Sequence, residues 1–400
     1  MTTDFVSRLA ELEERFEQCR PELELTVRDP EIGLEGYVVV HSTRAARGGP
    51  LGTIGKGGTR ITPQTSLEEV AMLAKTMTLK NAAAGLKLGG AKSGIRADPK
   101  APEFEKQYRR FAQLVRPILA EHGGPFGGFG FDIGGDPQHP IWICDELGSR
   151  RSFTGKPIEM GGTDYDRQGL AGLGVVIAAE EAMKHAGSTL FGARYSVQGI
   201  GAMGAAIVRY AEERGARLAF VSDPRIGGAY EIKNHDPILV SYLAEMNIEK
   251  ALMRLKDTNV SPISSDQILF QQVDVTFPAA IQNVIDEPRS ALVRSRFLVE
   301  AANNPCSPTA RDRMAARGIT VIPDFIANPG GIIAAYVELL STLDSYAHYA
   351  RDPVSAARDY IQQQIPANIA ECVRVASDFT IPIHKAARYL ALSRIVSESP

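Results

Sequence analysis

Two glycine-rich runs carry a lysine and an aspartate whose types suit proton transfer. Lys92 stands in residues 88–94, and Asp132 stands among glycines and phenylalanines in residues 123–136. A lysine and a carboxylate with small or apolar neighbours can tune each other's pKa, which suits an acid/base pair. The alternative is two surface loops with a solvated lysine and a turn aspartate. These two runs alone favour neither interpretation.

Two further lysines extend this candidate site. Lys56 lies in the glycine-rich segment 52–60, for which a loose hairpin turn is the simpler interpretation. Lys80 follows Met77 by three residues on the apolar stripe of an expected helix, where it either extends to the rim or holds an anion. Together with Lys92 they would form a cationic pocket for a carboxylate substrate. Crowding and burial there would lower the pKa of one lysine.

The elements that position these lysines and Asp132 are strands followed by helices. Strands are predicted within residues 23–61, and Ser66 begins a capping box that opens a helix reaching about residue 85. A second helix is predicted at residues 104–121, with Pro117 bending its last turn. Because strands and helices share this region, we expect an α/β domain.

The second half of the chain carries the pattern of a dinucleotide-binding unit. A short strand at 195–198 leads into the turn 199–204, a helix follows, and a second strand ends at Asp223, 19 positions after Gly204. The glycines allow a tight turn and the approach of a pyrophosphate to the helix N-terminus, while Asp223 would bond to the adenosine ribose. This order of elements favours a dinucleotide site over a purely structural βαβ unit. The residues expected at the cofactor are Gly199, Gly201, Ala202, Met203, Gly204, Asp223, Ala279, Asn303 and Asn328.

Length and composition limit the class of protein. A chain of 400 residues suits two domains, and its 44% apolar and 23% charged residues are ordinary for a globular protein in water. The net charge of −3 without a basic block argues against a nucleic-acid partner, and the apolar runs are too short for a membrane span. The four cysteines lie far apart without metal-ligand spacing. We therefore expect reduced thiols, a cytoplasmic location and no metal.

A series of short motifs follows one order along the chain. They include Lys-Gly-Gly-Thr-Arg at 56–60, Gly-Gly-Ala-Lys-Ser-Gly at 89–94, Gln-Gly-Ile-Gly at 198–201, Glu-Ala-Ala-Asn at 300–303 and Asn-Pro-Gly-Gly at 328–331. With these motifs the chain resembles the glutamate/leucine/phenylalanine/valine dehydrogenases over nearly its whole length. The resemblance implies oxidative deamination of an L-amino acid to a 2-oxo acid and ammonia with a nicotinamide cofactor.

The resemblance also implies a role for each candidate residue. Lys80 would hold the substrate α-carboxylate, and Lys92 would polarise the carbonyl and the attacking water. Asp132 would move protons to and from the amine. Lys56 matches the position where family members that act on glutamate bind the side-chain carboxylate. Hydride would pass from the substrate Cα to the nicotinamide across a cleft that closes against water.

Two alanines depart from the glutamate-type pattern. Ala335 stands where glutamate-specific members place a serine, and Ala171 replaces a threonine beside the nicotinamide amide. Each substitution removes a hydroxyl, and a lost hydrogen bond to a charged group costs about 1.5–3 kcal/mol. We expect a glutamate dehydrogenase. The two alternatives are a dehydrogenase for a different L-amino acid and a non-catalytic, amino-acid-sensing regulatory subunit of a glutamate dehydrogenase complex.

The expected architecture is α/β with two domains. The first is a substrate-binding and oligomerisation domain formed by residues 1–165 and completed by C-terminal helices at 335–400. The second, residues 166–334, is a Rossmann-type NAD(P)-binding domain. Asp223 favours NAD, whereas Arg225 permits NADP. The resemblance implies a homo-oligomer, with a hexamer favoured.

Overall fold

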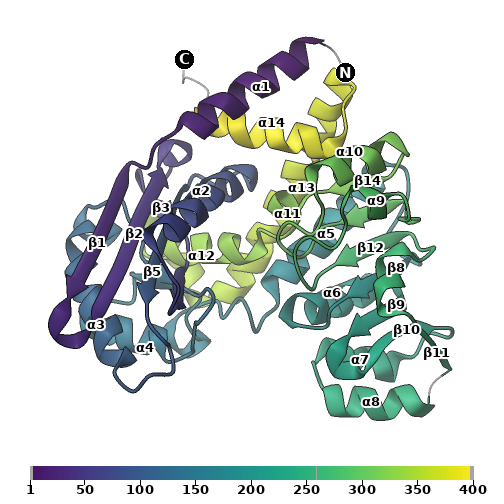
Figure 1. Ribbon diagram of the computed structural model, residues 1–400, viewed down its shortest axis with the longest axis horizontal. Coiled ribbons are helices and arrows are strands. Elements are labelled where there is room, and N and C mark those ends of the chain that lie inside the picture. The colour runs from purple at the N-terminus through teal and green to yellow at the C-terminus, as the bar shows by residue number, and fades with distance from the viewer. Residues whose placement is uncertain (1–2, 258, 397–400) are drawn as a thin grey trace. The chain divides into compact units, whose positions relative to one another are not determined.

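The chain folds into two compact units in a computed structural model that describes residues 3–257 and 259–396 (Figure 1). The N-terminal unit comprises Thr3–Tyr165, Ile332–Tyr360 and the described residues from Tyr389 onward, and the central unit comprises Asp166–Gly331 and Ile361–Arg388. The units differ from the predicted domains at the C-terminus, because residues 361–388 group with the central unit. No helix in the described ranges combines the length and apolar character that a membrane crossing requires.

The N-terminal unit is built on a five-stranded sheet. Its strands are β1 (Leu23–Asp29), β2 (Leu34–Ser42), β3 (Gly55–Lys56), β4 (Thr59–Thr62) and β5 (Gly89–Arg96). β1, β2 and β5 pair antiparallel, whereas β3 and β4 both pair with β5 in parallel. The interpretation of residues 52–60 as a loose hairpin turn is therefore wrong, since both short strands in this segment add to β5 and not to each other.

Helix α2 (Leu67–Ala83) packs closely on β5, and the glycines of β5 make this possible. A Cβ added to Gly90 would lie 2.1 Å from the Thr78 backbone nitrogen, and one added to Gly94 would lie 2.6 Å from Val70 Cγ2. Larger residues at either position would push the helix off the strand. The run that contains Lys92 is thus a buried strand and not a surface loop.

Local interactions explain where α2 begins and where the second predicted helix ends. Ser66 Oγ accepts a hydrogen bond from the Glu69 backbone N–H at 3.2 Å, which confirms the predicted N-cap of α2. The second helix, α3 (Phe104–Val115), is shorter than predicted. Pro117 lacks a backbone N–H and its ring clashes with the preceding turn, so the chain continues as a 3-10 turn at Arg116–Ile118.

The remaining elements of the N-terminal unit complete its core. Phe104, Tyr108 and Phe111 of α3 are almost fully buried against the sheet, and β6 (Phe129–Gly130) and β7 (Phe153–Thr154) form a short parallel pair beneath them. The other helices named in this region and at the C-terminus are α1 (Thr3–Gln18), α4 (His139–Leu147), α12 (Gly330–Leu340), α13 (Pro353–Phe379) and α14 (Ile383–Val396).

The central unit is built on a seven-stranded sheet in the order β11-β10-β9-β8-β12-β13-β14 (Figure 1). The five strands from β9 to β14 in this order are parallel, and β10 and β11 extend the edge antiparallel. The strands are β8 (Arg194–Gln198), β9 (Arg217–Asp223), β10 (Gly228–Ile232), β11 (Val260–Ile263), β12 (Val275–Pro278), β13 (Phe297–Val299) and β14 (Thr320–Ile322).

Helices accompany this sheet as in a doubly wound fold. They are α5 (Leu170–His185), α6 (Ala202–Glu213), α7 (Pro237–Ala244), α8 (Ile248–Asp257), α9 (Glu287–Ser290), α10 (Pro308–Ala316) and α11 (Asp324–Ala327). The strand order reverses at β8, whose neighbours are β9 on one side and β12 on the other. Ligands of open α/β sheets bind beyond the carboxyl ends of the strands at such a reversal. The predicted α/β class with a Rossmann-type unit is confirmed.

Candidate active site

A buried lysine, Lys92, and a half-buried aspartate, Asp132, form an ion pair in the N-terminal unit. Lys92 projects from β5 and is 6% exposed, and Asp132 follows β6. The Asp132 carboxylate also accepts the Ile133 backbone N–H at 2.7 Å, which fixes its orientation. The structure therefore brings together the two residues that the sequence suggests as an acid/base pair.

Arg60 contacts the carboxylate oxygen of Asp132 that Lys92 does not, and sequence reasoning assigned it no role. Its Nη2 lies 3.3 Å from Asp132 Oδ1, and its Nη1 lies 2.6 Å from Glu69 Oε1. The only signal in the sequence was its place in the glycine-rich segment that also carries Lys56. Arg60 thus links Asp132 to the first turn of α2.

Burial and charge shift the pKa of both members of the pair. Burial lowers the pKa of the Lys92 ammonium below its ordinary value, although the attraction of Asp132 opposes the shift. Burial alone would raise the pKa of Asp132, but the charges of Lys92 and Arg60 outweigh it and hold this pKa below its usual range. At neutral pH the aspartate is therefore ionised, while the lysine loses its proton more readily than a solvated lysine.

Lys56 is a buried ammonium that has only neutral hydrogen-bond acceptors. It is 1% exposed, and its Nζ donates to the carbonyls of Phe129 at 2.7 Å and Gly57 at 2.9 Å. In the chain as described it has no ion-pair partner, so its third N–H direction is available to a ligand. Burial lowers the pKa of Lys56 to about 7, and repulsion from Lys92 and Lys156 adds to this shift, whereas the attraction of the Glu338 carboxylate opposes it.

The sheet register explains why these lysines converge. Lys56 on β3 pairs with Gly90 on β5, two residues before Lys92, so both side chains start from one face of the sheet. Asn81 on α2 donates to the carbonyls of Lys56 at 3.2 Å and Gly89 at 2.6 Å. Its chain neighbour Lys80, which is half-buried, is thereby carried on the helix that lies against both strands.

Helix α12 carries Ala335 and is held by a buried carboxylate. Ala335 is buried, and three residues later Glu338 accepts hydrogen bonds from four donors. These donors are the backbone N–H groups of Gly155 and Thr163, the Thr163 hydroxyl and the Lys156 ammonium, at 2.6–3.0 Å. The carboxylate is fully satisfied, so Glu338 is a structural anchor that sequence reasoning did not identify.

The turn between β8 and α6 has the geometry of a phosphate cradle. Gly199 has a φ of +88°, and a Cβ added to Gly204 would lie 1.8 Å from the Gly199 carbonyl oxygen, so the fold itself requires both glycines. A Cβ added to Gly201 would meet no atom within 4 Å. The space beside Gly201, at the N-terminus of α6 where Ala202 and Met203 lie, therefore fits a pyrophosphate.

Asp223 ends β9, but its carboxylate is already occupied. It accepts hydrogen bonds from the Ile200 backbone N–H at 2.7 Å and from the backbone N–H, Nε and Nη2 of Arg225 at 2.9–3.1 Å. These four donors fill the acceptor positions of a carboxylate. In this conformation the Asp223 oxygens already accept hydrogen bonds from Arg225 and Ile200, which does not match the expected hydrogen bond between Asp223 and the ribose.

Polar groups gather at the carboxyl ends of the strands beyond β8. Ala279 follows β12, and Asn303 follows β13 and accepts from Asn328 Nδ2 at 3.2 Å. Asn328 also donates to the Ala301 carbonyl at 2.9 Å, and its buried Oδ1 has no hydrogen-bond partner within the described chain. An unpaired amide oxygen at this edge fits the amide N–H of a nicotinamide.

Comparisons with known proteins agree with this geometry. Residues 161–399 match the Glutamate/Leucine/Phenylalanine/Valine dehydrogenase family, and residues 21–148 match the Glu/Leu/Phe/Val dehydrogenase dimerisation domain. The chain is 36% identical to an NADP(+)-dependent glutamate dehydrogenase of Pyrobaculum calidifontis over 77% of its own length and 73% of that protein. It is 33% identical to glutamate dehydrogenase A2 of Halobacterium salinarum over 85% and 81%.

A solved structure is similar over almost the whole chain. It is a hetero-hexameric glutamate dehydrogenase from Thermus thermophilus with a TM-score of 0.73 and 28% identity, and the match covers 98% of this chain and 96% of that one. The sequence motifs, the two units and the sheet order therefore all point to one kind of protein.

Proposed function

The chain belongs to the Glutamate/Leucine/Phenylalanine/Valine dehydrogenase family of amino acid oxidoreductases, and from this premise we propose that it is a glutamate dehydrogenase. The reaction is the reversible conversion of L-glutamate, water and oxidised nicotinamide cofactor to 2-oxoglutarate, ammonium, reduced cofactor and a proton. The observation that carries the proposal is the ion pair of Lys92 with Asp132 and a second buried lysine, Lys56, that has no ion-pair partner among the described residues.

Lys56 and Lys80 bind the two carboxylates of the substrate. Lys56 has one N–H direction open and a positive charge that its neutral hydrogen-bond acceptors stabilise poorly. A side-chain carboxylate of the substrate supplies both the missing acceptor and the opposite charge. Lys80 receives the α-carboxylate from the adjacent helix. A substrate with two carboxylates therefore neutralises charges that a monocarboxylate leaves in place.

Lys92 and Asp132 move the protons of the reaction. Oxidation removes a hydride from Cα and a proton from the amine, and the imine that forms then adds water and releases ammonia. Asp132, ionised at neutral pH, accepts the amine proton and returns one to the leaving ammonia. Lys92, with its lowered pKa, polarises the substrate oxygen and activates the attacking water. Arg60 keeps the Asp132 carboxylate oriented throughout.

The nicotinamide cofactor supplies the acceptor for the hydride. The turn 199–204 would hold its pyrophosphate at the N-terminus of α6, and Asn328 would hold its carboxamide. Asn303 accepts a hydrogen bond from Asn328 and so orients it, and Ala279 stands directly after β12.

Arg225 supports the use of NADP as well as NAD. Its guanidinium lies at the end of β9, where the adenosine ribose of a Rossmann cofactor is placed, and its side chain is 48% exposed. A 2′-phosphate can pair with this guanidinium, whereas a ribose hydroxyl would have to displace it from Asp223. The Pyrobaculum calidifontis relative is named as NADP(+)-dependent, which agrees with this proposal.

We also propose a hexamer as the assembly. The matched dimerisation domain and the hexameric assembly of the Thermus thermophilus relative support it. Mass measurement of the native protein tests it, with six copies per particle expected.

A regulatory subunit is the second candidate function. The resemblance places Ala335 where glutamate-specific members carry a serine that helps bind the side-chain carboxylate, and the missing hydroxyl weakens the case for fast turnover of glutamate. The Thermus thermophilus relative is described as hetero-hexameric, so assemblies of unlike subunits occur in this family. In this alternative the pocket still binds an amino acid but turns it over slowly or not at all.

The deciding experiment measures oxidation of NADH and NADPH with ammonia and a panel of 2-oxo acids. We expect 2-oxoglutarate to react faster than branched or aromatic 2-oxo acids, and the Lys92→Ala and Asp132→Ala variants to lose at least about a hundredfold in turnover. A preference for a different oxo acid would keep the mechanism and overturn the substrate. Absence of turnover with tight amino acid binding would favour the regulatory subunit, and unchanged turnover in Asp132→Ala would refute its role.

A further inference from the structure

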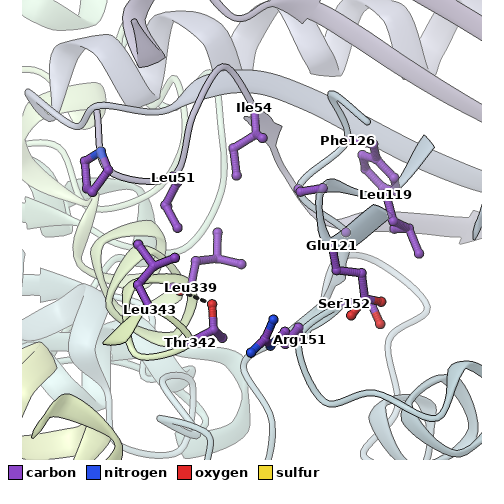
Figure 2. A pocket seen from close by; sticks show the side chains of 14 residues that line it. Leu51, Ile54, Leu119, Glu121, Phe126, Arg151, Ser152, Leu339, Thr342 and Leu343 are labelled. Carbon is purple, nitrogen blue, oxygen red and sulfur yellow. Dashed lines mark hydrogen bonds between the residues drawn. The ribbon is translucent and has the colours of Figure 1, made fainter. Parts of the chain in front are cut away.

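Glu300 is a fully buried carboxylate that the proposed reaction does not use. It directly follows β13 in the central unit and is 0% exposed. Glu121 of the N-terminal unit offers a contrast, because Figure 2 shows it on the wall of a cavity of about 240 Å³. Since the Glu300 carboxylate is fully enclosed by the protein, its effect must pass through the protein groups that it contacts.

Arg311 of α10 holds Glu300 in a bidentate ion pair. Its Nε donates to Glu300 Oε1 at 2.8 Å, and its Nη2 donates to Glu300 Oε2 at 2.7 Å. Two parallel hydrogen bonds from a planar guanidinium fix direction as well as distance. The Asp324 backbone N–H donates to the same Oε2 at 3.0 Å, and Asp324 is the first residue of α11. The pair therefore joins the end of β13 to α10 and to the start of α11.

The Asp324 carboxylate extends this network to the turn after β13. Its Oδ2 accepts the Asn304 backbone N–H at 2.8 Å, and its Oδ1 lies 3.7 Å from Arg311 Nη2. Asn304 has a φ of +47°, in the left-handed region that few residues other than glycine adopt. Its carbonyl accepts the Asn283 backbone N–H at 2.9 Å from the segment after β12. The turn is therefore held from both sides in one conformation.

The two asparagines expected at the nicotinamide lie directly beside these fixed points. Asn303 precedes Asn304, and Asn328 follows α11, where its backbone N–H donates to the Asp324 carbonyl at 2.9 Å. The 3.2 Å hydrogen bond from Asn328 Nδ2 to Asn303 Oδ1 requires both segments to be in place. Movement of either segment would therefore displace Asn328 Oδ1, to which no described residue donates a hydrogen bond.

We propose that Glu300, Arg311 and Asp324 are positioning residues for the nicotinamide end of the cofactor. They act through the two asparagines, whereas the turn at 199–204 that would hold the pyrophosphate does not depend on them. The inference rests on the proposed function, because it takes Asn328 as the partner of the nicotinamide carboxamide.

Calorimetry on the full-length protein tests this role with two ligands that differ only at one end. They are NADH and ADP-ribose, or NADPH and ADP-ribose 2′-phosphate if the protein binds NADPH more tightly. We expect Glu300→Gln to weaken binding of the reduced cofactor at least about tenfold and binding of the matching ADP-ribose less than about twofold. Arg311→Lys keeps the charge but loses the parallel hydrogen bonds, so its loss should lie between those of Glu300→Gln and the unmodified protein.

Two matched variants serve as controls. Glu121→Gln makes the same exchange at the cavity wall of the N-terminal unit. Asp236→Asn removes a buried carboxylate of the central unit that Arg254 Nε contacts at 2.8 Å. Asp236 follows β10, which runs antiparallel to β9 and so ends at the edge of the sheet opposite the carboxyl ends of the parallel strands. Both controls should bind the two ligands as the unmodified protein does.

A second variant covers the case in which an unpaired buried charge prevents folding. Replacing only one member of a buried ion pair leaves the other uncompensated, whereas replacing both by neutral residues of similar size is often tolerated. The double variant Glu300→Gln/Arg311→Met carries neither charge, and circular dichroism checks that it folds. We expect it to show the same selective loss of the reduced cofactor.

Kinetics adds a readout that a purely structural role would not give. In Glu300→Gln the kcat with 2-oxoglutarate should fall at least about tenfold while the KM for 2-oxoglutarate stays unchanged, because a displaced nicotinamide impairs hydride transfer and not substrate binding. Equal loss of the two ligands, or unchanged binding of the reduced cofactor in the folded variants, would overturn the positioning role and leave the proposed function standing. The same selective loss in Asp236→Asn would also overturn it. If the unmodified chain binds neither NADH nor NADPH, the proposed function fails and the positioning role fails with it.

Discussion

Replacing Lys56 by methionine should make the protein more stable at neutral pH. The side chain of methionine has similar length and no charge, so the variant removes only the titrating group and its hydrogen bonds. Burial lowers the pKa of Lys56 from the ordinary 10.5 to about 7. Between these two values the unfolded chain holds a proton that the folded chain lacks, so the stability of the unmodified protein rises with pH across this window.

The size of the effect follows from the two pKa values. Since one pKa unit corresponds to about 1.4 kcal/mol, burial of Lys56 costs about 4 kcal/mol at pH 7, and this cost disappears as the pH approaches 10.5. The variant does not pay this cost. It does remove the Lys56 donor from the carbonyls of Phe129 and Gly57, which costs about 1–3 kcal/mol at every pH, although the Thr154 hydroxyl still lies 3.5 Å from the Phe129 carbonyl. Only the pH-dependent part therefore identifies Lys56.

The assay is urea unfolding of both proteins from pH 7 to pH 10 at one fixed protein concentration, because assembly contributes to apparent stability. We expect the variant to lose about 4 kcal/mol relative to the unmodified protein over this range. Lys184→Met, at a lysine whose side chain is 74% exposed, is the control and should show no such change. A pH-independent difference between Lys56→Met and the unmodified protein would refute the burial argument.

Three further predictions concern binding. The KM for 2-oxoglutarate should rise by up to tenfold per pH unit above pH 7, because the second carboxylate needs a charged Lys56. The KM for 2-oxobutyrate, which has one carboxylate, should not rise in this way. Parallel pH dependences of the two KM values would contradict this prediction. Arg225→Ala should raise the KM for NADPH at least tenfold and lower the KM for NADH, since it frees the Asp223 carboxylate. Initial rates with both cofactors measure this. An unchanged ratio of the two KM values would exclude the role of Arg225. Gly201→Val should weaken cofactor binding in fluorescence titration without lowering the melting temperature. Gly204→Val should lower the melting temperature, because its side chain would clash with the Gly199 carbonyl. Equal melting temperatures of the two variants would show that the space beside Gly201 is not reserved for a ligand.

The nucleotide-binding unit could be predicted because its signals are local. The turn at 199–204, the preceding strand and the acidic residue at the end of the next strand all lie within 30 residues and require no long-range contact. What the local pattern could not show is the conformation of Arg225. The pattern places Asp223 beside the ribose, but only the folded chain shows that Arg225 already uses all its oxygens.

The N-terminal sheet was harder to predict because glycine is rare in strands. By composition residues 89–94 suited a surface loop as well as a buried site, yet they form the middle of the sheet. The reason is tertiary: Gly90 and Gly94 lack side chains so that α2 can approach. The same close contact brings Lys80 near the strand that carries Lys92.

The pairing of β3 with β5 explains what sequence reasoning found in the site and what it missed. Lys56 and Lys92 lie 36 positions apart in the chain, and a parallel pairing of a two-residue strand leaves no periodic signal. Composition did suggest that both lysines face a cavity. It did not predict that Arg60 would hold Asp132, because an arginine in a glycine-rich segment is compatible with many partners.

Because Glu338 anchors α12, the position of this helix does not depend on which small residue it carries at position 335. Four donors hold the carboxylate, so the helix keeps its place whatever small residue stands one turn earlier at position 335. In our proposal Ala335 lines the substrate pocket, so an exchange between serine and alanine there would alter the pocket at little cost in stability. The preferred amino acid could then change by a single substitution, without a compensating change elsewhere in the fold.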